Sequence, residues 1–409
     1  MEKDKTISVI GIGRVGLPLS LTLADAGFKV FGIDIDKKLV ENLNNKKMPF
    51  METGAQELLE RYINNKFIPR LDFEKLAESK YIIISLGTPV DEHLNPNYSQ
   101  IDSVKKILAD NMQKEQTIIL RSTVSPGTTN YLKDFLQKKT GLICGKGFYL
   151  AFCPERIAEG KAIKEIKEIP QIIGGIDKES SEKAKELFTE ICSECLVSDA
   201  ESAELAKIYT NMYRYINFAI ANEFAILASE YNKNIYEVLR LTNTNYKRGK
   251  IPQPGFTAGP CLFKDGFFLL NKIPFSELIS TSWRINENLP IYLIEKIKEN
   301  LDLKNKKAVI LGATFKKNID DTRNSLSFKI KKTLLREQCK VVMHDPYIKN
   351  YNTNIIKSLE KADLVVIATN HDEYKKLNKN FLKKLVNPNC IICDIWNIIN
   401  GGKIIYDLK

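Results

Sequence analysis

The sequence predicts an α/β protein with two mainly parallel sheets joined by a long central helix. Two observations predict the sheets: short β-rich runs alternate with helix-length amphipathic stretches, first from Ile7 to about Val197 and again from Lys306 onward. A third predicts the helix, because Ala200 to about Glu230 contains no glycine or proline and its apolar residues recur at helical spacing. A chain of 409 residues is long enough for two or three domains.

Seven runs in the first unit are expected to be strands. Strands that alternate with helices at this spacing form βαβ units, so most neighbouring strands should be parallel. In chain order the runs are TISVIGIG, KVFGIDI, YIIISLG, QTIILRS, FYLAFCPE, QIIGG and CLVSD.

The alternation returns in a second, smaller unit, with the runs KKAVILGATF, CKVVMHDPYI, ADLVVIATN and CIICDIWNII. Between the units, IPQPGFTAGPCLFKDG is rich in glycine and proline and follows no period. This is typical of a functional loop, with a plain connector as the alternative. We therefore expect a first sheet domain over residues 1–199, a central helical region with the loop over 200–300, and a second sheet domain over 301–409.

Composition excludes several classes of protein. Hydrophobic residues make up 44% and charged residues 27% of the chain, which rules out a largely disordered or fibrous protein. The net charge is 61 − 50 = +11, but the lysines are spread over many helix-like segments, so we expect no nucleic-acid partner. The sequence has no bilayer-length apolar run and no signal-peptide pattern, so we expect a cytoplasmic protein without membrane contact.

The eight cysteines are too few for a disulfide scaffold, and in a cytoplasmic chain they would stay reduced. Cys192 with Cys195, and Cys390 with Cys393, have CxxC spacing, but no neighbouring histidine completes a ligand set. We therefore expect no metal. With only three histidines, a general base is expected to be a carboxylate or a lysine.

The glycine-rich motif GIGRVG lies between the first expected strand and a helix-like segment. Gly11 allows the tight turn, Gly13 lets the backbone approach a pyrophosphate, and Gly16 lets helix and strand pack closely. Asp34 ends the second strand, where a carboxylate accepts hydrogen bonds from ribose hydroxyls and repels a 2′-phosphate. The motif predicts dinucleotide binding, with NAD favoured over NADP and a structural glycine turn as the alternative.

Three more motifs follow expected strands, at the sheet edge where ligands bind in open α/β folds. They contain Thr88 in GTP, Thr123 in RSTV, and the acids Glu155 and Glu159 in CPERIAEG. A hydroxyl at a strand end is as often structural as it is a ligand contact. The acids suit general acid/base chemistry, with helix capping as the alternative.

Lys207 and Asn211 lie four residues apart on the expected long helix and therefore share one face. Lys207 could be either a solvated surface lysine or a buried cation. Cys261 lies in the irregular loop, and Asp265 follows four residues later. This pattern suits a nucleophile with a nearby base, although most free cysteines are small core residues. The cations of FKKNIDDTR could hold phosphates, with surface charge as the alternative.

The chain resembles the UDP-glucose/GDP-mannose dehydrogenase family, the nucleotide-sugar 6-dehydrogenases, over essentially its whole length. Eight features in order carry the resemblance: GIGRVG, Asp34, GTP, RSTV, CPERIAEG, AKIYTN, GPCLFKD and FKKNIDDTR. It implies an N-terminal Rossmann-like domain for NAD and a C-terminal one for the UDP-sugar, joined by a helix that forms a homodimer. It also implies four-electron oxidation of the sugar C6 hydroxyl to a carboxylate, through a cysteine thiohemiacetal and thioester, to supply surface polysaccharide synthesis.

The resemblance assigns catalytic roles to individual residues. Cys261 would be the nucleophile, Asp265 would activate water or accept a proton, and Lys207 would stabilise an oxyanion. Asn211 would hold the sugar and an ordered water, and Glu155 would act in thioester hydrolysis.

It also implies contacts to NAD and to the substrate, and it places Thr123 in both the catalytic and the cofactor set. The residues expected to contact NAD are Gly11, Gly13, Arg14, Val15, Gly16, Asp34, Thr88, Thr123, Glu159 and Arg323. Lys316 would meet the nucleotide-sugar phosphates, and Arg248 would reach the substrate across the dimer. The full substrate set is Glu155, Arg156, Lys207, Asn211, Arg248 and Lys316.

Two sequence details bear on activity and substrate. The loop reads AGPC where many relatives read GGSC or GGHC, so Pro260 stiffens the backbone before the nucleophile, although activity is still expected. CPER, with Arg156, resembles the branch that oxidises UDP-N-acetylhexosamines, whereas the UDP-glucose branch more often has Asn-Pro-Glu-Phe. A UDP-N-acetylhexosamine is therefore favoured, with UDP-glucose as the alternative and GDP-mannose less favoured.

Two other classes of protein share part of this pattern. A two-electron β-hydroxyacid dehydrogenase has an N-terminal Rossmann domain and a lysine/asparagine pair, but it needs neither the cysteine loop nor the second sheet. A non-enzymatic dinucleotide-binding regulator would have an unreactive Cys261. The GPCLFKD loop and the βα repeat after Lys306 argue against the two-electron dehydrogenase. The regulator would also have a basic cluster on one element.

Overall fold

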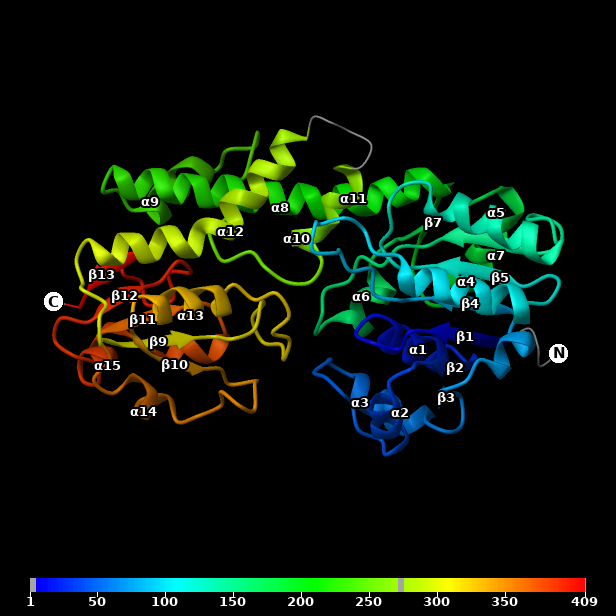
Figure 1. Ribbon diagram of the computed structural model, residues 1–409, viewed down its shortest axis with the longest axis horizontal. Helices are drawn as coiled ribbons and strands as arrows, with labels where there is room; N and C mark the ends of the chain where they lie inside the picture. The colour runs from blue at the N-terminus through cyan, green and yellow to red at the C-terminus, as the bar shows by residue number, and fades with distance from the viewer. Residues whose placement is uncertain (1–4, 271–275, 409) are drawn as a thin grey trace. The chain divides into compact units, whose positions relative to one another are not determined.

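The computed structural model describes residues 5–270 and 276–408, and the chain divides into two compact units (Figure 1). The first unit takes in the chain up to Thr210 and a short segment that begins at Phe267. The second contains Asn211–Gly266 and the chain beyond that segment. Each unit is built around one sheet, and the expected class, with two mainly parallel sheets and a long helix, is confirmed.

The first sheet has the strand order β3-β2-β1-β4-β5-β6-β7-β8. Neighbouring strands are parallel except β6 and β7, which are antiparallel. All seven expected strands are present. The sequence analysis missed β3, a four-residue edge strand that contains a proline. The strands are β1 (Thr6–Ile10), β2 (Lys29–Ile33), β3 (Phe67–Arg70), β4 (Tyr81–Ile84), β5 (Thr117–Leu120), β6 (Tyr149–Phe152), β7 (Gln171–Gly175) and β8 (Cys195–Asp199).

Helices cover both faces of this sheet, because its central strands are apolar on both sides. Ile83 and Ile119 pack into one hydrophobic cluster, and their neighbours Ile82 and Ile118 pack into the cluster on the opposite face. The helices of this unit are α1 (Gly16–Asp25), α2 (Lys37–Asn44), α3 (Ala55–Tyr62), the 3₁₀-helix η2 (Glu74–Glu78), α4 (Ser99–Asn111), α5 (Thr128–Thr140), α6 (Ala162–Glu168), α7 (Lys178–Phe188) and α11 (Phe267–Leu270).

The long central helix is α8, Ala200–Glu230, as expected from the sequence. Its first turns are tied to the first unit by Glu204, which is 1% exposed. The Glu204 carboxylate accepts hydrogen bonds at the start of α5 from the Gly127 N–H (2.6 Å), the Thr129 N–H (2.8 Å) and the Thr129 hydroxyl (2.6 Å). It therefore supplies acceptors to N–H groups that the first turn of α5 leaves without helical partners.

The second sheet has the order β10-β9-β11-β12-β13, and all its pairs are parallel except β12 with β13. The four expected strands are present. The sequence analysis missed β13, which has three residues and lies at the sheet edge. The strands are β9 (Lys307–Leu311), β10 (Lys340–His344), β11 (Leu364–Ile367), β12 (Ile391–Cys393) and β13 (Ile405–Asp407).

This sheet is also covered on both faces. One hydrophobic cluster joins it to α9 and α12, and a second lies on the opposite face. Besides the later turns of α8, the helices of the second unit are α9 (Ile235–Asn243), α10 (Leu262–Asp265), α12 (Glu277–Lys298), α13 (Ser327–Arg336), α14 (Ile355–Leu359), the 3₁₀-helix η3 (Asp372–Lys376) and α15 (Lys379–Lys383).

The eight cysteines are free thiols, and the sulfur atoms of Cys192 and Cys195 are 3.6 Å apart. Within residues 5–270 and 276–408, no three His, Cys, Asp or Glu side chains are grouped so that they could hold a metal ion. In the same ranges, no helix is long and apolar enough to cross a membrane.

The Glu204→Ala substitution should lower the free energy of unfolding of the first unit by about 2–3 kcal/mol, because buried donors would lose their charged acceptor. Urea unfolding followed by circular dichroism measures this change. Glu201→Ala, on an exposed position one turn earlier, is the matched control. Equal stability of the two variants would contradict the anchoring role of Glu204.

Candidate active site

The loop between β1 and α1 has the geometry that a dinucleotide pyrophosphate requires. Gly11 has φ +87°, and a side chain there would collide with the Ser85 carbonyl oxygen. A side chain at Gly16 would collide with the Gly11 carbonyl oxygen, whereas one at Gly13 would meet nothing within 4 Å. The first turn of α1, which follows Val15, has no acidic residue to oppose an anion at the positive end of the helix dipole. The loop therefore fits the pyrophosphate of NAD.

Asp34 lies just after β2, beside this loop, and is half-buried. Its Oδ2 accepts a hydrogen bond from the Ile12 N–H at 3.0 Å, and its Oδ1 accepts one from the Asp36 N–H at 3.0 Å. Each carboxylate oxygen has two lone pairs, so the pattern leaves acceptor capacity for ribose hydroxyls.

Arg14 and Glu159, both expected to contact NAD, lie together in the first unit. The Arg14 guanidinium is 3.7 Å from the Glu159 carboxylate and 4.9 Å from the centre of the Phe50 ring. The two side chains are 19% and 21% exposed, so this ion pair adds little stability. The pair instead fixes position, because it holds the PERIAEG loop, which contains Glu159, next to the glycine loop, which contains Arg14.

The loops after β4 and β5 are bonded to each other. The Thr88 hydroxyl donates to the Thr123 carbonyl oxygen at 2.6 Å, and the Leu86 N–H donates to the Ser122 hydroxyl at 2.8 Å. Two of the expected NAD contacts therefore lie side by side at the carboxyl edge of the sheet.

Glu155 is engaged in an ion pair that the sequence analysis missed. Its carboxylate accepts from the Arg121 guanidinium, with Nε at 3.1 Å, and from the N–H groups of Arg156 (2.8 Å) and Ile157 (3.1 Å). The Arg121 side chain is 1% exposed. The Arg156 guanidinium donates to the carbonyl oxygen of Pro170. The structure therefore holds both Glu155 and Arg156 by contacts within the first unit.

Asn211, Lys264 and Asp265 form a buried polar cluster. The Asn211 amide donates to Oδ2 of Asp265 at 2.6 Å, and the Lys264 ammonium is 2.7 Å from Oδ1 of the same residue. Asp265 is completely buried and Lys264 is 9% exposed. The sequence analysis gave Lys264 no role, because a lysine beside an acid is ordinarily a surface residue.

Cys261 lies at the start of α10, and its side chain is exposed. Its carbonyl oxygen accepts from the Lys264 N–H at 3.2 Å and from the Asp265 N–H at 3.1 Å. One turn of α10 therefore separates Cys261, whose side chain is exposed, from Asp265 of the buried cluster. Lys207, on α8 in the first unit, is half-buried.

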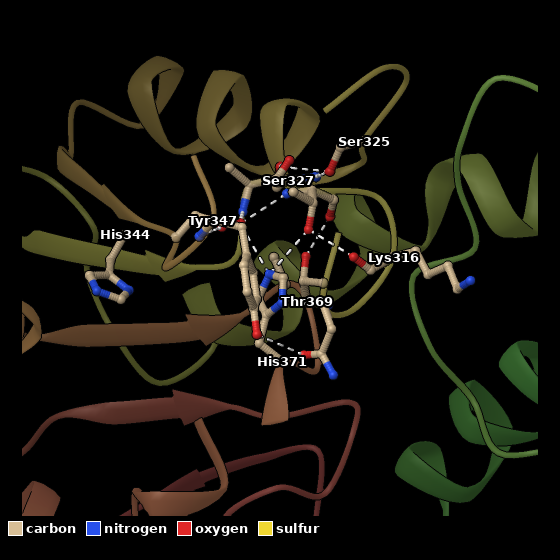
Figure 2. Close-up of polar contacts among 12 residues, drawn as sticks. Lys316, Ser325, Ser327, His344, Tyr347, Thr369 and His371 are labelled. Carbon is tan, nitrogen blue, oxygen red and sulfur yellow. Dashed lines mark hydrogen bonds and ion pairs between the residues drawn. The ribbon is translucent and has the colours of Figure 1, made fainter. Parts of the chain in front are cut away.

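Lys316 lies in the loop that follows β9, and a polar network holds this loop (Figure 2). The Lys316 carbonyl oxygen accepts from the Thr314 hydroxyl at 2.9 Å, and the Thr369 hydroxyl donates to the Thr314 carbonyl oxygen. Figure 2 shows the Lys316 side chain extending away from this network. The network thus positions the backbone while the ammonium points outward.

His371, labelled in Figure 2, belongs to this network through Thr314 and pairs with Asp345, and both side chains are completely buried. The Asn318 N–H donates to Nδ1 of His371 at 2.9 Å, so Nε2 carries the proton and donates to Oδ2 of Asp345 at 3.1 Å. Oδ2 also accepts from the N–H groups of Ala313 (2.7 Å) and Thr314 (3.1 Å). Burial opposes ionisation, but the hydrogen bonds from His371 and the backbone outweigh it and lower the pKa of Asp345.

Asp345 was missed by the sequence analysis, although a signal was present. It directly follows the second strand of its unit, as Asp34 does in the first unit, and it bonds the loop after the preceding strand in the same way. His371 offered no comparable signal.

Two expected ligand contacts lie on the second unit. The Arg323 guanidinium makes a bidentate ion pair with Asp321, with Nε 2.9 Å and 3.0 Å from the two oxygens. Arg248 is exposed in the loop after α9, with its guanidinium 5.0 Å from the centre of the Tyr246 ring.

Comparisons with known proteins cover nearly the whole chain. Models of the UDP-glucose/GDP-mannose dehydrogenase family match in three parts: its NAD binding domain at residues 5–192, its central domain at 201–288 and its UDP binding domain at 309–401. A UDP-N-acetyl-D-mannosamine dehydrogenase of Methanocaldococcus jannaschii is 34% identical over 413 residues, covering 97% of this chain and 93% of that protein.

Solved structures agree with this match. The UDP-D-ManNAc dehydrogenase of Pyrococcus horikoshii superposes with a TM-score of 0.87 at 32% identity, covering 93% of each chain. The UDP-N-acetyl-mannosamine dehydrogenase of Staphylococcus aureus gives a TM-score of 0.87 at 28% identity, covering 97% of this chain and 95% of that one. The chain therefore belongs to the UDP-glucose/GDP-mannose dehydrogenase family and is a nucleotide-sugar dehydrogenase with an NAD-binding and a UDP-binding domain.

Proposed function

We propose that this enzyme oxidises the C6 hydroxyl of a UDP-sugar to a carboxylate, removing four electrons in two steps, with Cys261 as the nucleophile. The observation that carries the proposal is the exposed Cys261 at the start of α10, one helical turn before Asp265 of the buried cluster with Asn211 and Lys264. A two-electron alcohol oxidation needs no such thiol. Retaining an aldehyde for a second oxidation does, because a thiolate captures it and later leaves.

The C6 alcohol loses a hydride and a proton to become an aldehyde, and the Cys261 thiolate adds to C6 to form a thiohemiacetal. Loss of a second hydride and proton leaves a thioester. Water then attacks C6, the C6–S bond breaks with its electron pair returning to sulfur, and the uronate is released. Two NAD⁺ molecules in succession, held by the NAD binding domain, would supply the hydride acceptor for the two oxidations.

The remaining groups would hold the sugar and manage protons and charge. Lys207 would stabilise the negative oxygen on C6 in the tetrahedral species, where a fixed cation is worth more than in water. Asp265, held by Asn211 and Lys264, would accept a proton or activate the water. Glu155, held in place by Arg121, would serve acid/base steps of hydrolysis.

Most of the residues proposed to hold NAD lie in the first domain, and the proposed phosphate contact of the UDP-sugar lies in the second. The glycine loop, Asp34, Arg14 and Glu159 would hold NAD, with Thr88 and Thr123 at the neighbouring strand ends. Lys316 would bind the phosphates of the UDP-sugar from the second domain.

A UDP-N-acetylhexosamine is the favoured substrate, and the N-acetylmannosamine epimer comes first because relatives 34% and 32% identical carry that name. Arg156 in CPER supports the same branch. UDP-glucose is the alternative. The uronate product would supply surface polysaccharide synthesis from the cytoplasm.

The partner would be a second copy of this chain, which would pack against α8. Large apolar side chains along this helix are exposed, which is costly unless another surface covers them. They are Tyr209, Tyr213, Ile220, Phe224 and Leu227.

The substrate and the electron count can be tested together. We expect two NADH per mole of limiting UDP-N-acetylmannosamine, measured by absorbance, in a panel that includes the other UDP-N-acetylhexosamines, UDP-glucose and GDP-mannose. Two NADH on UDP-glucose alone would overturn the substrate preference. One NADH per sugar would overturn the four-electron reaction.

The Cys261→Ser variant should make no more than one NADH per sugar and should lower uronate formation by at least about a hundredfold, because the serine hydroxyl is a far weaker nucleophile than a thiolate. Uronate is quantified by mass spectrometry. Cys192→Ser, at another partly exposed cysteine, should leave turnover unchanged. Full two-step turnover by Cys261→Ser would disprove the covalent mechanism.

The Lys207→Ala variant should reduce kcat by about a hundredfold or more, because a charged stabiliser of the oxyanion is lost. Steady-state NADH release measures it, with Lys207→Arg as the variant that retains the charge. If Lys207→Ala keeps kcat within about threefold of the parent enzyme, the oxyanion role is wrong.

A further inference from the structure

The loop that leads to Cys261 has no regular secondary structure, yet it is buried. Its residues 254–259 are all buried, and they run in irregular conformation toward the nucleophile at the start of α10. Buried backbone N–H and C=O groups need hydrogen-bond partners, and here they cannot come from a helix or a sheet. One partner comes from the backbone of another loop, since the Gly259 N–H donates to the Asn324 carbonyl oxygen at 3.4 Å. Further partners come from side chains of other elements.

Two asparagines supply those partners, and each bonds both backbone groups of one loop residue. At the end of α9, Asn243 accepts from the Ile251 N–H at 2.9 Å and donates to the Ile251 carbonyl oxygen at 2.8 Å. From α8, Asn222 accepts from the Gly255 N–H at 2.9 Å and donates to the Gly255 carbonyl oxygen at 3.1 Å. The loop is thus clamped at two points, four residues apart.

The clamp at Gly255 is the more rigid one. Asn222 and Asn286 are both completely buried, and the second hydrogen of the Asn222 amide donates to Oδ1 of Asn286 at 2.9 Å. The Asn286 amide in turn donates to the Tyr215 carbonyl oxygen at 3.2 Å. Since both donors and the acceptor of the Asn222 amide are assigned by these contacts, its side chain has one satisfied orientation.

Aromatic rings close the loop on its other side. A side chain at Gly255 would collide with the Trp396 ring, and one at Gly259 would collide with the Phe315 ring. Phe315 directly precedes Lys316, the residue proposed to bind the substrate phosphates. Within the second unit, the loop therefore packs on the residue next to Lys316 shortly before it reaches Cys261.

We propose that Asn222 is a positioning residue for the oxidation: by clamping Gly255, it places Cys261 relative to the Lys316 segment. The inference rests on the proposed function in taking Cys261 as the nucleophile and Lys316 as the residue that binds the substrate phosphates. Asn222 touches neither reacting atom in this scheme, so its effect is transmitted through six residues of backbone. Misplacing a reacting group by about 1 Å can cost about a hundredfold in rate.

The test compares Asn222→Ala with Asn217→Ala. Asn217 lies on the same helix, but its amide bonds only to the Tyr213 carbonyl oxygen of that helix. We expect Asn222→Ala to lower kcat by about ten- to a hundredfold, with KM for NAD⁺ and the Kd for UDP each within about threefold of the parent. Asn217→Ala should leave all three unchanged.

Two readouts do not depend on turnover. Hydrogen exchange in peptides covering residues 255–261 should accelerate at least tenfold in Asn222→Ala while the five-stranded sheet keeps its protection. The rate at which iodoacetamide alkylates Cys261 should also differ between Asn222→Ala and the parent enzyme. Mass spectrometry locates the alkylated site. If exchange instead accelerates equally across the whole unit, or if kcat stays within twofold, the positioning role is wrong.

Two outcomes separate this inference from the proposed function. A parent enzyme that oxidises no nucleotide sugar overturns the proposed function, while exchange and alkylation still decide whether Asn222 holds the loop. If Asn222→Ala does not fold, Asn243→Ala at the less buried clamp takes its place. We then expect faster hydrogen exchange at residues 251–255 and a kcat about threefold lower than that of the parent. An unchanged Asn243→Ala then counts against the clamp.

Discussion

The structure depends on a charge-assisted hydrogen bond that occurs once in each sheet. A carboxylate that follows the second strand accepts backbone N–H groups of the loop that follows the first strand, Asp34 from Ile12 and Asp345 from Ala313. These N–H groups leave the sheet at its carboxyl edge without ladder partners, so a charged acceptor is a strong way to satisfy them. The shapes of the glycine loop and of the Lys316 loop both follow from this contact.

The same contact serves different purposes because the two carboxylates differ in burial. Asp34 is half-buried and keeps acceptor capacity toward solvent, which suits a ribose. Asp345 is completely buried, and His371, Thr314 and Ala313 crowd its Oδ2 while the Tyr347 N–H occupies Oδ1 at 2.8 Å. The same contact thus leaves a carboxylate open to further hydrogen bonds in the first unit and encloses it in a buried network in the second. This agrees with a UDP binding domain rather than a second dinucleotide site.

The Cys261 loop shows how an irregular segment is made rigid without secondary structure. A carboxamide is a side chain that can accept from one backbone group and donate to another at once, so one asparagine can replace a step of a β-ladder. Asn222 and Asn243 do this at Gly255 and Ile251. The Trp396 and Phe315 rings also leave no room for a side chain at Gly255 and Gly259. The result is an exposed thiol shortly after a buried stretch, residues 254–259.

Much of this protein follows from local sequence. The strand runs, the bounds of α8, the glycine loop and Asp34 were predictable because periodicity and glycine spacing act over a few residues and constrain the backbone directly. The edge strands β3 and β13 were missed because each is too short to show alternation.

The choice of partners among polar side chains was decided only by the tertiary structure. Glu155 meets Arg121 across 34 residues, His371 meets Asp345 across 26, and Asn222 meets Gly255 across 33. No local period marks such pairs, because they depend on which strand ends are neighbours in the sheet and on which groups become buried together. The sequence by itself therefore determined the elements and the class of chemistry, while the fold determined which groups are held, which are exposed and how Cys261 is placed.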